Sequence, residues 1–91
     1  MFIRVTRGRF SPANQDAMMR ALQEQVIPAV RQLPGFKSFQ IGLDRDAGRV
    51  VAVSAFDTRE QTEAMAAQRA PGEAVGIQFE PAEVYEIIAQ A

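Results

Sequence analysis

The chain has 91 residues, of which 47% are hydrophobic, and its 10 Lys and Arg against 11 Asp and Glu give a net charge of −1. This charge argues against nucleic acid as the main partner, because binding phosphate needs a positive field. Cysteine, histidine and tryptophan are absent, which excludes disulfides, thiol nucleophiles, imidazole bases and the usual zinc or haem ligands.

The same composition sets several expectations about organisation. We expect one domain over residues 1–91, with no metal and no cofactor. No apolar run approaches the roughly 20 residues of a membrane span, and Arg4 stands where a signal peptide would need an apolar core. We therefore expect no membrane association and a cytoplasmic location. A domain of this size is marginally stable alone, which favours an oligomer.

The first third of the chain predicts a strand followed by a helix. Residues 2–9 alternate as a strand, and Ser11-Pro12 is a typical helix start. Pro28 should kink or split the helix near Ile27, because proline lacks the backbone donor. The helix carries one apolar stripe at helical spacing, formed by Met18, Leu22, Val26, Val30 and Leu33.

A hairpin is predicted in the middle of the chain. Pro34-Gly35 ends the first helix, because proline cannot continue it and glycine takes the left-handed backbone. Residues 36–43 then read as a strand, 44–48 (DRDAG) as a turn, and 49–56 as the returning strand.

The last third predicts a second helix and a final strand. Thr58 and Gln61 have capping-box spacing, and Ala70-Pro71-Gly72 should end the helix. Residues 73–80 stay ambiguous, a short helical turn being one interpretation, and Val84 to Ala89 form the last strand. The order is βαββαβ, an α+β ferredoxin-like fold with a four-stranded antiparallel sheet and both helices on one face.

Both faces of this predicted sheet are apolar, although two helices can cover only one of them. The odd-numbered face carries more apolar area than a soluble monomer leaves in water. We therefore predict a homodimer through the odd-numbered sheet face. Its interface would consist of Ile3, Val5, Phe39, Ile41, Val51 and Val53.

The chain resembles the dimeric α+β barrel superfamily, near the antibiotic-biosynthesis-monooxygenase-like domains. The runs that carry the resemblance are 3–7 (IRVTR), 26–29 (VIPA), 33–36 (LPGF), 44–48 (DRDAG), 52–57 (AVSAFD) and 83–87 (EVYEI). It implies a dimer whose sheets face each other as a barrel, with a ligand pocket in each subunit between sheet and helices. Some members are cofactor-independent oxygenases of polycyclic phenols.

The chain departs from the haem-degrading members of that superfamily. Those use an Asn on the first strand, a Trp at the end of the third and a His on the second helix. The corresponding positions look like Thr6 and Phe56, and the chain has no histidine. The resemblance therefore does not extend to haem degradation. Phe56 keeps an aromatic wall but lacks the indole donor.

Polar side chains on the even-numbered face are the candidate site. In the functional interpretation they line a pocket for a small aromatic or phenolic molecule; in the structural one, Arg4 and Glu86 form an ion pair at the sheet edge. No catalytic residue is identified, and Tyr85 is either an acid–base group or a packing residue with a polar tip. The candidate binding residues are Arg4, Thr6, Phe36, Gln40, Ser54, Phe56 and Glu86.

Two classes of function follow. One is a cofactor-free monooxygenase-like oxidoreductase, and the other is a non-catalytic ligand-binding or structural dimer. RNA-recognition motifs share the topology but need aromatic residues on the third strand, where residues 49–54 have none. Acylphosphatases also share it, but residues 7–12 (RGRFSP) do not match their phosphate loop.

Overall fold

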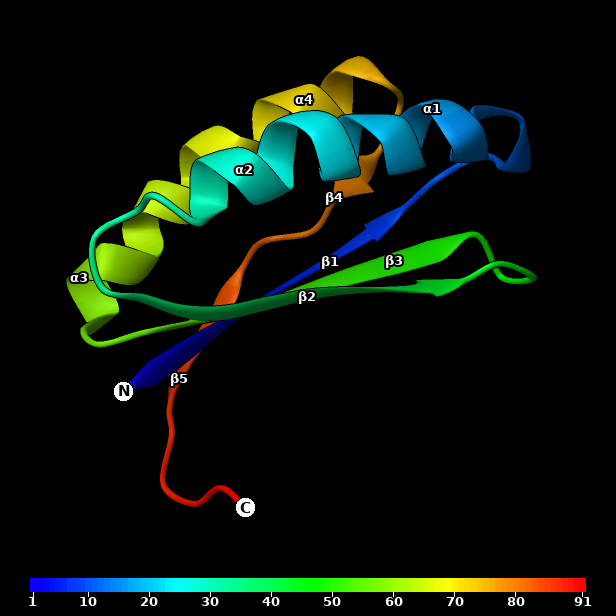
Figure 1. The fold of residues 1–91 in the computed structure, drawn as a ribbon. Helices are drawn as coiled ribbons and strands as arrows, with labels where there is room; N and C mark the ends of the chain where they lie inside the picture. Colours follow the sequence, from blue (N-terminus) through cyan, green and yellow to red (C-terminus); the bar gives the residue numbers. More distant parts are fainter.

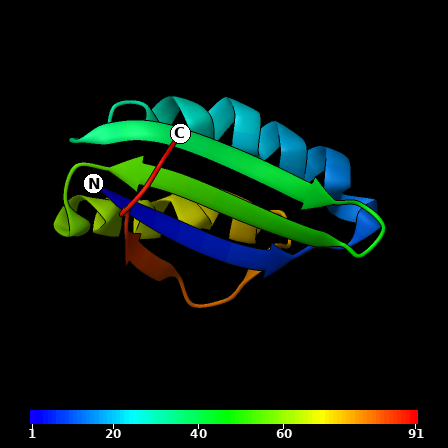
Figure 2. The ribbon, with the colours of Figure 1, turned by 90° about the horizontal axis from the view of Figure 1, so that it is seen from below.

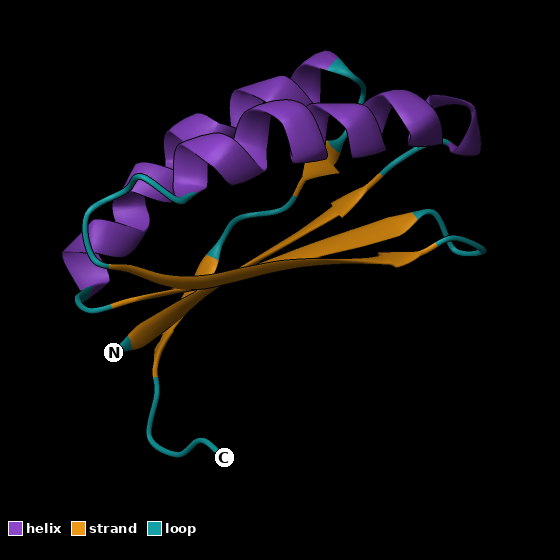
Figure 3. Ribbon diagram, viewed as in Figure 1, coloured by secondary structure: helices purple, strands orange, loops and turns teal.

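A computed structural model describes residues 1–91 and shows an antiparallel sheet with every helix packed on one of its faces (Figure 1). The strand order is β2-β3-β1, and both β4 and β5 pair with the remaining edge of β1. The fold is the predicted α+β ferredoxin-like arrangement, with one additional two-residue strand (Figure 3). The strands are β1 (Phe2–Arg9), β2 (Phe36–Asp44), β3 (Arg49–Phe56), β4 (Gln78–Phe79) and β5 (Glu83–Glu86).

The first helical segment is interrupted close to the position that Pro28 predicts. The backbone N–H of Ile27 donates to the carbonyl of Leu22, five residues earlier, which is a π-helical bond. Pro28 has no N–H to continue the ordinary ladder, so the irregular turn lies directly before it. The segment consists of a 3-10 turn (Pro12–Asn14), α1 (Gln15–Ala21), a π-helical turn (Leu22–Val26) and α2 (Ile27–Val30).

The helical segment ends at Val30, before the predicted stop at Pro34-Gly35, and Gly35 instead belongs to the turn that leads into β2. The φ of Gly35 is 74°, in the left-handed region that favours glycine. A Cβ atom at this position would lie 1.8 Å from the side-chain oxygen of Gln61, so an alanine would also push this flexible side chain aside. The carbonyl of Gly35 accepts the backbone N–H of Asp57, which joins the entry of β2 to the exit of β3.

The second helical segment runs further than its sequence predicts. The capping box is confirmed, with Thr58 and Gln61 exchanging hydrogen bonds of 3.0 and 3.2 Å. The predicted end at Pro71-Gly72 is wrong, because both residues lie inside α4. Proline is tolerated in the first turn of a helix, and a Cβ at Gly72 would lie only 2.9 Å from Ile77. The segment consists of α3 (Arg59–Thr62), a 3-10 stretch (Glu63–Arg69) and α4 (Ala70–Ala74).

The C-terminal strand is shorter than predicted. Glu86 pairs with Phe2, the first residue of β1, so the residues after Glu86 have no strand to pair with. The ambiguous segment 73–80 contributes the end of α4 and the strand β4, whose Phe79 pairs with Gly8.

A bulge in β2 exchanges the faces of most of that strand. The register against β3 shifts between Phe36 and Ser38, so Phe39 pairs with Ser54 and Ile41 with Ala52. Cross-strand partners share a face. The prediction that Phe39 and Ile41 belong to the open face is therefore wrong, and both pack against the helix-side core. On β1 and β3 the even-numbered residues face the helices, as predicted.

The core lies between the sheet and the helices. Phe56 is fully buried, and its ring meets that of Phe36 edge to face at a centroid distance of 6.1 Å. Seen from the opposite side, the sheet carries no helix (Figure 2). No helix of this structure is long and apolar enough to cross a membrane. The buried core residues are Phe10, Met18, Leu22, Val26, Val30, Val50, Phe56, Met65 and Ile77.

Candidate functional site

A small cavity of about 40 Å³ lies between the sheet and the helices. This volume has room for about three water molecules. Its walls are mainly apolar, and its polar lining comes from Thr6, Gln68 and Arg69. The full lining is Thr6, Leu22, Val26, Phe39, Ile41, Val50, Ala52, Met65, Gln68, Arg69, Ile77 and Phe79.

Arg69 brings a positive charge to this cavity. One guanidinium nitrogen donates to the carbonyl of Glu80 at 2.8 Å, and the guanidinium lies 5.5 Å from the ring centroid of Phe79. Its Nε is buried and has no hydrogen-bond partner. A buried donor without a partner costs free energy, and Arg69 lines the cavity, so a small movement of its side chain would let this nitrogen donate to an acceptor there.

Arg4 adds a second positive charge under the helices. It lies two residues before Thr6 on the same face of β1, and its Nη1 donates to the carbonyl of Thr62 at 3.4 Å. Burial lowers the pKa of Arg4 from its ordinary value, the charge of Arg69 lowers it further, and Glu63 partly opposes both effects. Arg4 itself does not line the cavity.

Neither arginine has a carboxylate partner within ion-pair distance. The two ion pairs of the structure are Arg7–Glu83 and Lys37–Asp57. Two guanidinium groups close enough to affect each other electrostatically, neither of them in an ion pair, favour binding of an anion, although the nearby Glu63 offsets part of the charge of Arg4. The apolar walls beside Arg69 favour an anion that carries an aromatic ring.

The predicted binding residues are only partly brought together. Thr6 lines the cavity, and Ser54 and Phe56 are buried on the same face without lining it. Phe36 packs on the core beside Phe56. Gln40 lies on the opposite face, because the bulge in β2 pairs it with Val53.

The predicted ion pair between Arg4 and Glu86 is wrong. Glu86 pairs with Phe2 and Arg4 with Val84, so Arg4 and Glu86 lie on one face but two residues out of register, and they form no ion pair. Instead, Arg7 pairs with Glu83 on the open face. Tyr85 is half exposed and donates its hydroxyl proton to the same carboxylate, which places its polar tip at this edge.

Arg69 and Gln68 are the site residues that sequence reasoning missed. A signal for Arg69 is present in the second helical segment, where buried Thr62 and Met65 precede it by seven and four residues. These are the spacings of one face of an α-helix, although the structure forms a 3-10 stretch from Glu63 to Arg69. The alternation of Ile77 and Phe79 with polar residues similarly indicates the short strand that closes the cavity.

Comparison with known proteins gives the family. The family model described as antibiotic biosynthesis monooxygenase matches residues 1–73. The chain belongs to this family. No curated protein sequence matches this member.

Solved structures of the same family have the same fold. A protein from Deinococcus radiodurans assigned to the antibiotic biosynthesis monooxygenases has a TM-score of 0.78 at 13% identity, covering 100% of this chain and 96% of its own. A Streptomyces coelicolor monooxygenase in complex with nanaomycin D has a TM-score of 0.70 at 17% identity, with coverages of 99% and 88%. SnoaB, a cofactor-independent oxygenase from Streptomyces nogalater, has a TM-score of 0.68 at 15% identity, with coverages of 98% and 94%. At these identities the likeness is one of fold.

Proposed function

We propose that this family member binds a small aromatic anion, such as a hydroxylated aromatic acid or a phenolate, between the sheet and the helices. The observation that carries the proposal is the buried, unpartnered Nε of Arg69, a residue that lines a mainly apolar cavity. Arg4 would add to the positive potential, and Thr6 would offer a hydroxyl. Occupants larger than about three waters require the flexible side chains of Met65, Gln68 and Arg69 to move aside.

A cofactor-independent monooxygenation is the reaction proposed for this site. The family description and the two oxygenase neighbours support it. On a hydroxylated anthrone, one oxygen atom of O₂ would convert the ring methylene to a carbonyl. The other oxygen would leave as water with the two methylene hydrogens, so the substrate supplies all the electrons. The arginines would stabilise the anion of the substrate, and the apolar walls would exclude water.

A non-catalytic ligand-binding or structural dimer is the alternative function. The small volume of the cavity favours it, because a polycyclic substrate needs far more space than the side chains leave. Oxygen uptake with a hydroxylated anthrone, compared with the protein-free rate, separates the two functions. Saturable binding without accelerated uptake would select the non-catalytic alternative.

We propose in addition that the open face forms a homodimer. Its central strands present the apolar side chains of Ile3, Val5, Val51 and Val53, and no helix covers them. Burying such a surface is favourable for a domain of this size. The cytoplasm remains the location predicted from sequence, and cell fractionation would check it.

Calorimetric titration with salicylate and with phenol tests the binding site. Salicylate carries a charge at neutral pH and phenol does not, so an arginine site should discriminate between them. Removing one charge-assisted hydrogen bond with Arg69→Leu should weaken salicylate about tenfold or more and phenol less than about threefold. Arg4→Leu should weaken salicylate by less than Arg69→Leu.

Arg31→Leu is the matched control, because Arg31 is an exposed arginine beyond the end of α2. It should leave both affinities unchanged. Equal losses for the two ligands in Arg69→Leu, or salicylate binding that is insensitive to both Arg4→Leu and Arg69→Leu, would contradict the proposed site.

A further inference from the structure

One wall of the covered cavity is held much less firmly than the others. It is the segment 77–80, whose Ile77 and Phe79 both line the cavity. The sheet beside it is firmly built, because β1 and β3 pair along their whole lengths. The strand β4 within the segment is only two residues long, and it lies at the edge of the sheet with β1 as its one neighbour. This segment, which we call the strap, is therefore the wall that can move at the lowest cost.

Both ends of the strap can absorb such a movement. Gly76, directly before it, has a φ of 95°, in the left-handed region that favours glycine. Pro81, directly after it, lies outside any helix or strand and has no backbone N–H to pair. Hinges are typically a few residues of this kind at the ends of an element.

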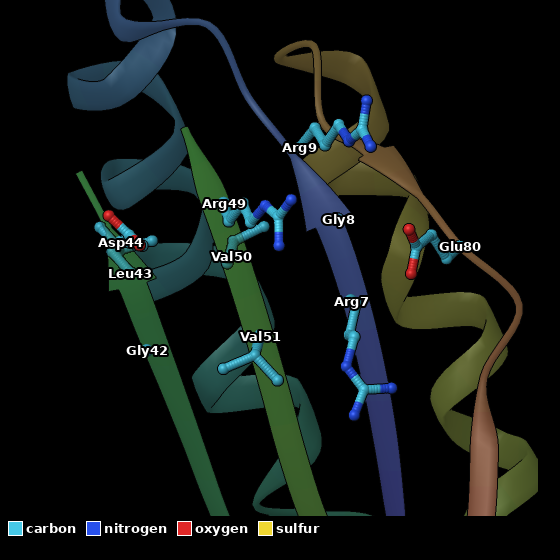
Figure 4. A pocket seen from close by; sticks show the side chains of 10 residues that line it. All are labelled: Arg7, Gly8, Arg9, Gly42, Leu43, Asp44, Arg49, Val50, Val51 and Glu80. Atoms are coloured by element: carbon cyan, nitrogen blue, oxygen red, sulfur yellow. The ribbon is translucent and has the colours of Figure 1, made fainter. Parts of the chain in front are cut away.

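The strap lies directly against Gly8 of β1. A Cβ atom at Gly8 would lie 2.9 Å from the side chain of Ile77 and 3.1 Å from the backbone oxygen of Gln78. Figure 4 shows Gly8 on β1, beside the segment that carries Glu80. Such a close approach requires a residue without a side chain. A methyl group at Gly8 would therefore push the strap away from β1.

Arg69 holds the strap from the helix side. Its Nη2 donates to the carbonyl of Glu80 at 2.8 Å, and its guanidinium lies 5.5 Å from the ring centroid of Phe79, so both partners belong to the strap. The unpartnered Nε lies on the same edge of the guanidinium as Nη2. A carboxylate binds such an edge with both of its oxygens. Two oxygen acceptors at Nη2 repel each other, so a bound carboxylate would weaken the hold of Arg69 on the strap.

The cavity needs more space for an aromatic ring than it now has. Its volume is about 40 Å³. A cavity that holds benzene has about 150 Å³. Movement of the side chains of Met65, Gln68 and Arg69 widens the cavity. Displacement of the strap would add the space that Ile77 and Phe79 now fill.

We propose that the strap is a movable wall, which leaves β1 when an aromatic carboxylate binds to Arg69. This inference rests on the proposed binding site and adds how that site makes room for its ligand. The ligand binds the form with the strap displaced, so its apparent affinity depends on the fraction of the protein in that form. A substitution that displaces the strap should therefore tighten binding, although the substituted residue does not touch the ligand.

Amide hydrogen exchange with and without salicylate tests the movement of the strap. The reporters are the backbone N–H groups of Ile77 and Glu80, whose hydrogen bonds of 3.0 and 2.8 Å hold the two ends of the strap. Saturating salicylate should speed their exchange about tenfold or more. It should not speed exchange at Asp57, whose N–H is bonded at the far end of β3.

Gly8→Ala displaces the strap without changing a residue that lines the covered cavity. Exchange at Glu80 should be faster in the ligand-free variant than in wild type, and salicylate should bind about threefold or more tighter. Gly42→Ala is the matched control, because Gly42 is also a strand glycine and its added Cβ would meet only Val51, at 3.4 Å. It should match wild type in both measurements.

Three results would contradict the inference, and they separate it from the binding site. Salicylate binding that leaves exchange at Ile77 and Glu80 unchanged or slower would overturn the movable strap and leave the site standing. Weaker binding to Gly8→Ala than to Gly42→Ala would do the same. Absence of salicylate binding to both wild type and Gly8→Ala would refute the proposed function, and the role of the strap with it.

Discussion

The two faces of this sheet come from the same strands but treat their arginines differently. On the covered face, Arg4 and Arg69 are held by the backbone carbonyls of Thr62 and Glu80 and meet no carboxylate. On the open face, Arg7 is paired with Glu83 in partial contact with water. Burial under the helices lowers the pKa of Arg4. Arg9 and Arg49 of the open face also lack an ion pair, but they are exposed to water. The covered face instead holds Arg4 and Arg69 close enough to affect each other beside a mainly apolar cavity, as an anion-binding site requires.

The two faces also differ in how deeply their apolar residues are buried. Under the helices, Phe56 and its neighbours form a closed core. On the open face, Val51 and Val53 are only partly buried by their own chain. A substitution on the covered face should therefore act on folding, and one on the open face on association.

The largest expected effect concerns the covered face. Phe56→Ala removes a fully buried ring and should cost about 3–5 kcal/mol of unfolding free energy. Urea denaturation measures it. Tyr85→Ala is the open-face control and should cost much less, because Tyr85 is half exposed. Similar costs for the two variants would remove the distinction between the faces.

The second-largest expected loss of stability concerns Gly35, in the turn before β2. Gly35→Ala forces a left-handed alanine, which costs about 1–2 kcal/mol, and places its Cβ against the Gln61 side chain. Adding Gln61→Ala to Gly35→Ala should remove the clash and so recover part of the lost unfolding free energy. Gln61→Ala alone is the reference for this comparison. If the double variant loses as much unfolding free energy as the two single variants together, Gly35→Ala causes no clash with Gln61.

On the open face, Val53→Asp should act on association. A charge placed at the centre of the proposed interface would be buried without a partner, so the dimer should dissociate. Light scattering should give about twice the 10.0 kDa chain mass for wild type and for Val53→Thr, and the single-chain mass for Val53→Asp. A wild-type monomer at micromolar concentration would refute the dimer.

The smallest effect is expected for the open-face ion pair. Both partners are substantially exposed, so Glu83→Gln should change the unfolding free energy by less than about 1 kcal/mol. The change should shrink further at high salt. A larger, salt-independent loss would mean that the Arg7–Glu83 pair is buried in the assembled protein.

The regular strands and the capping box could be read from the sequence, because local chemistry decides them. The strands at 2–9 and 49–56 alternate between clear turn signals, and Gly35 and Thr58 act on their nearest neighbours. Strict alternation through Lys37-Ser38 does not reveal the bulge in β2, where the register shifts by one residue. Two consecutive polar residues between Phe36 and Phe39 are the sign of the shift.

The candidate site was harder to predict than the fold. Sequence reasoning found Thr6 and Arg4 from strand parity, but the exact register decides whether Arg4 meets Glu86, and parity alone does not give register. Arg69 depends on how a 3-10 stretch and α4 pack over β1, which involves contacts between distant parts of the chain.

Methyl NMR of the methionines during a salicylate titration tests the central claim most directly. Met65 lines the cavity, and Met1 is exposed at the start of the chain, so the two methyl groups report on different environments. The account predicts a saturable shift of the Met65 methyl signal that Arg69→Leu abolishes, with Met1 unchanged. A Met65 signal that stays constant while salicylate binds elsewhere would contradict it.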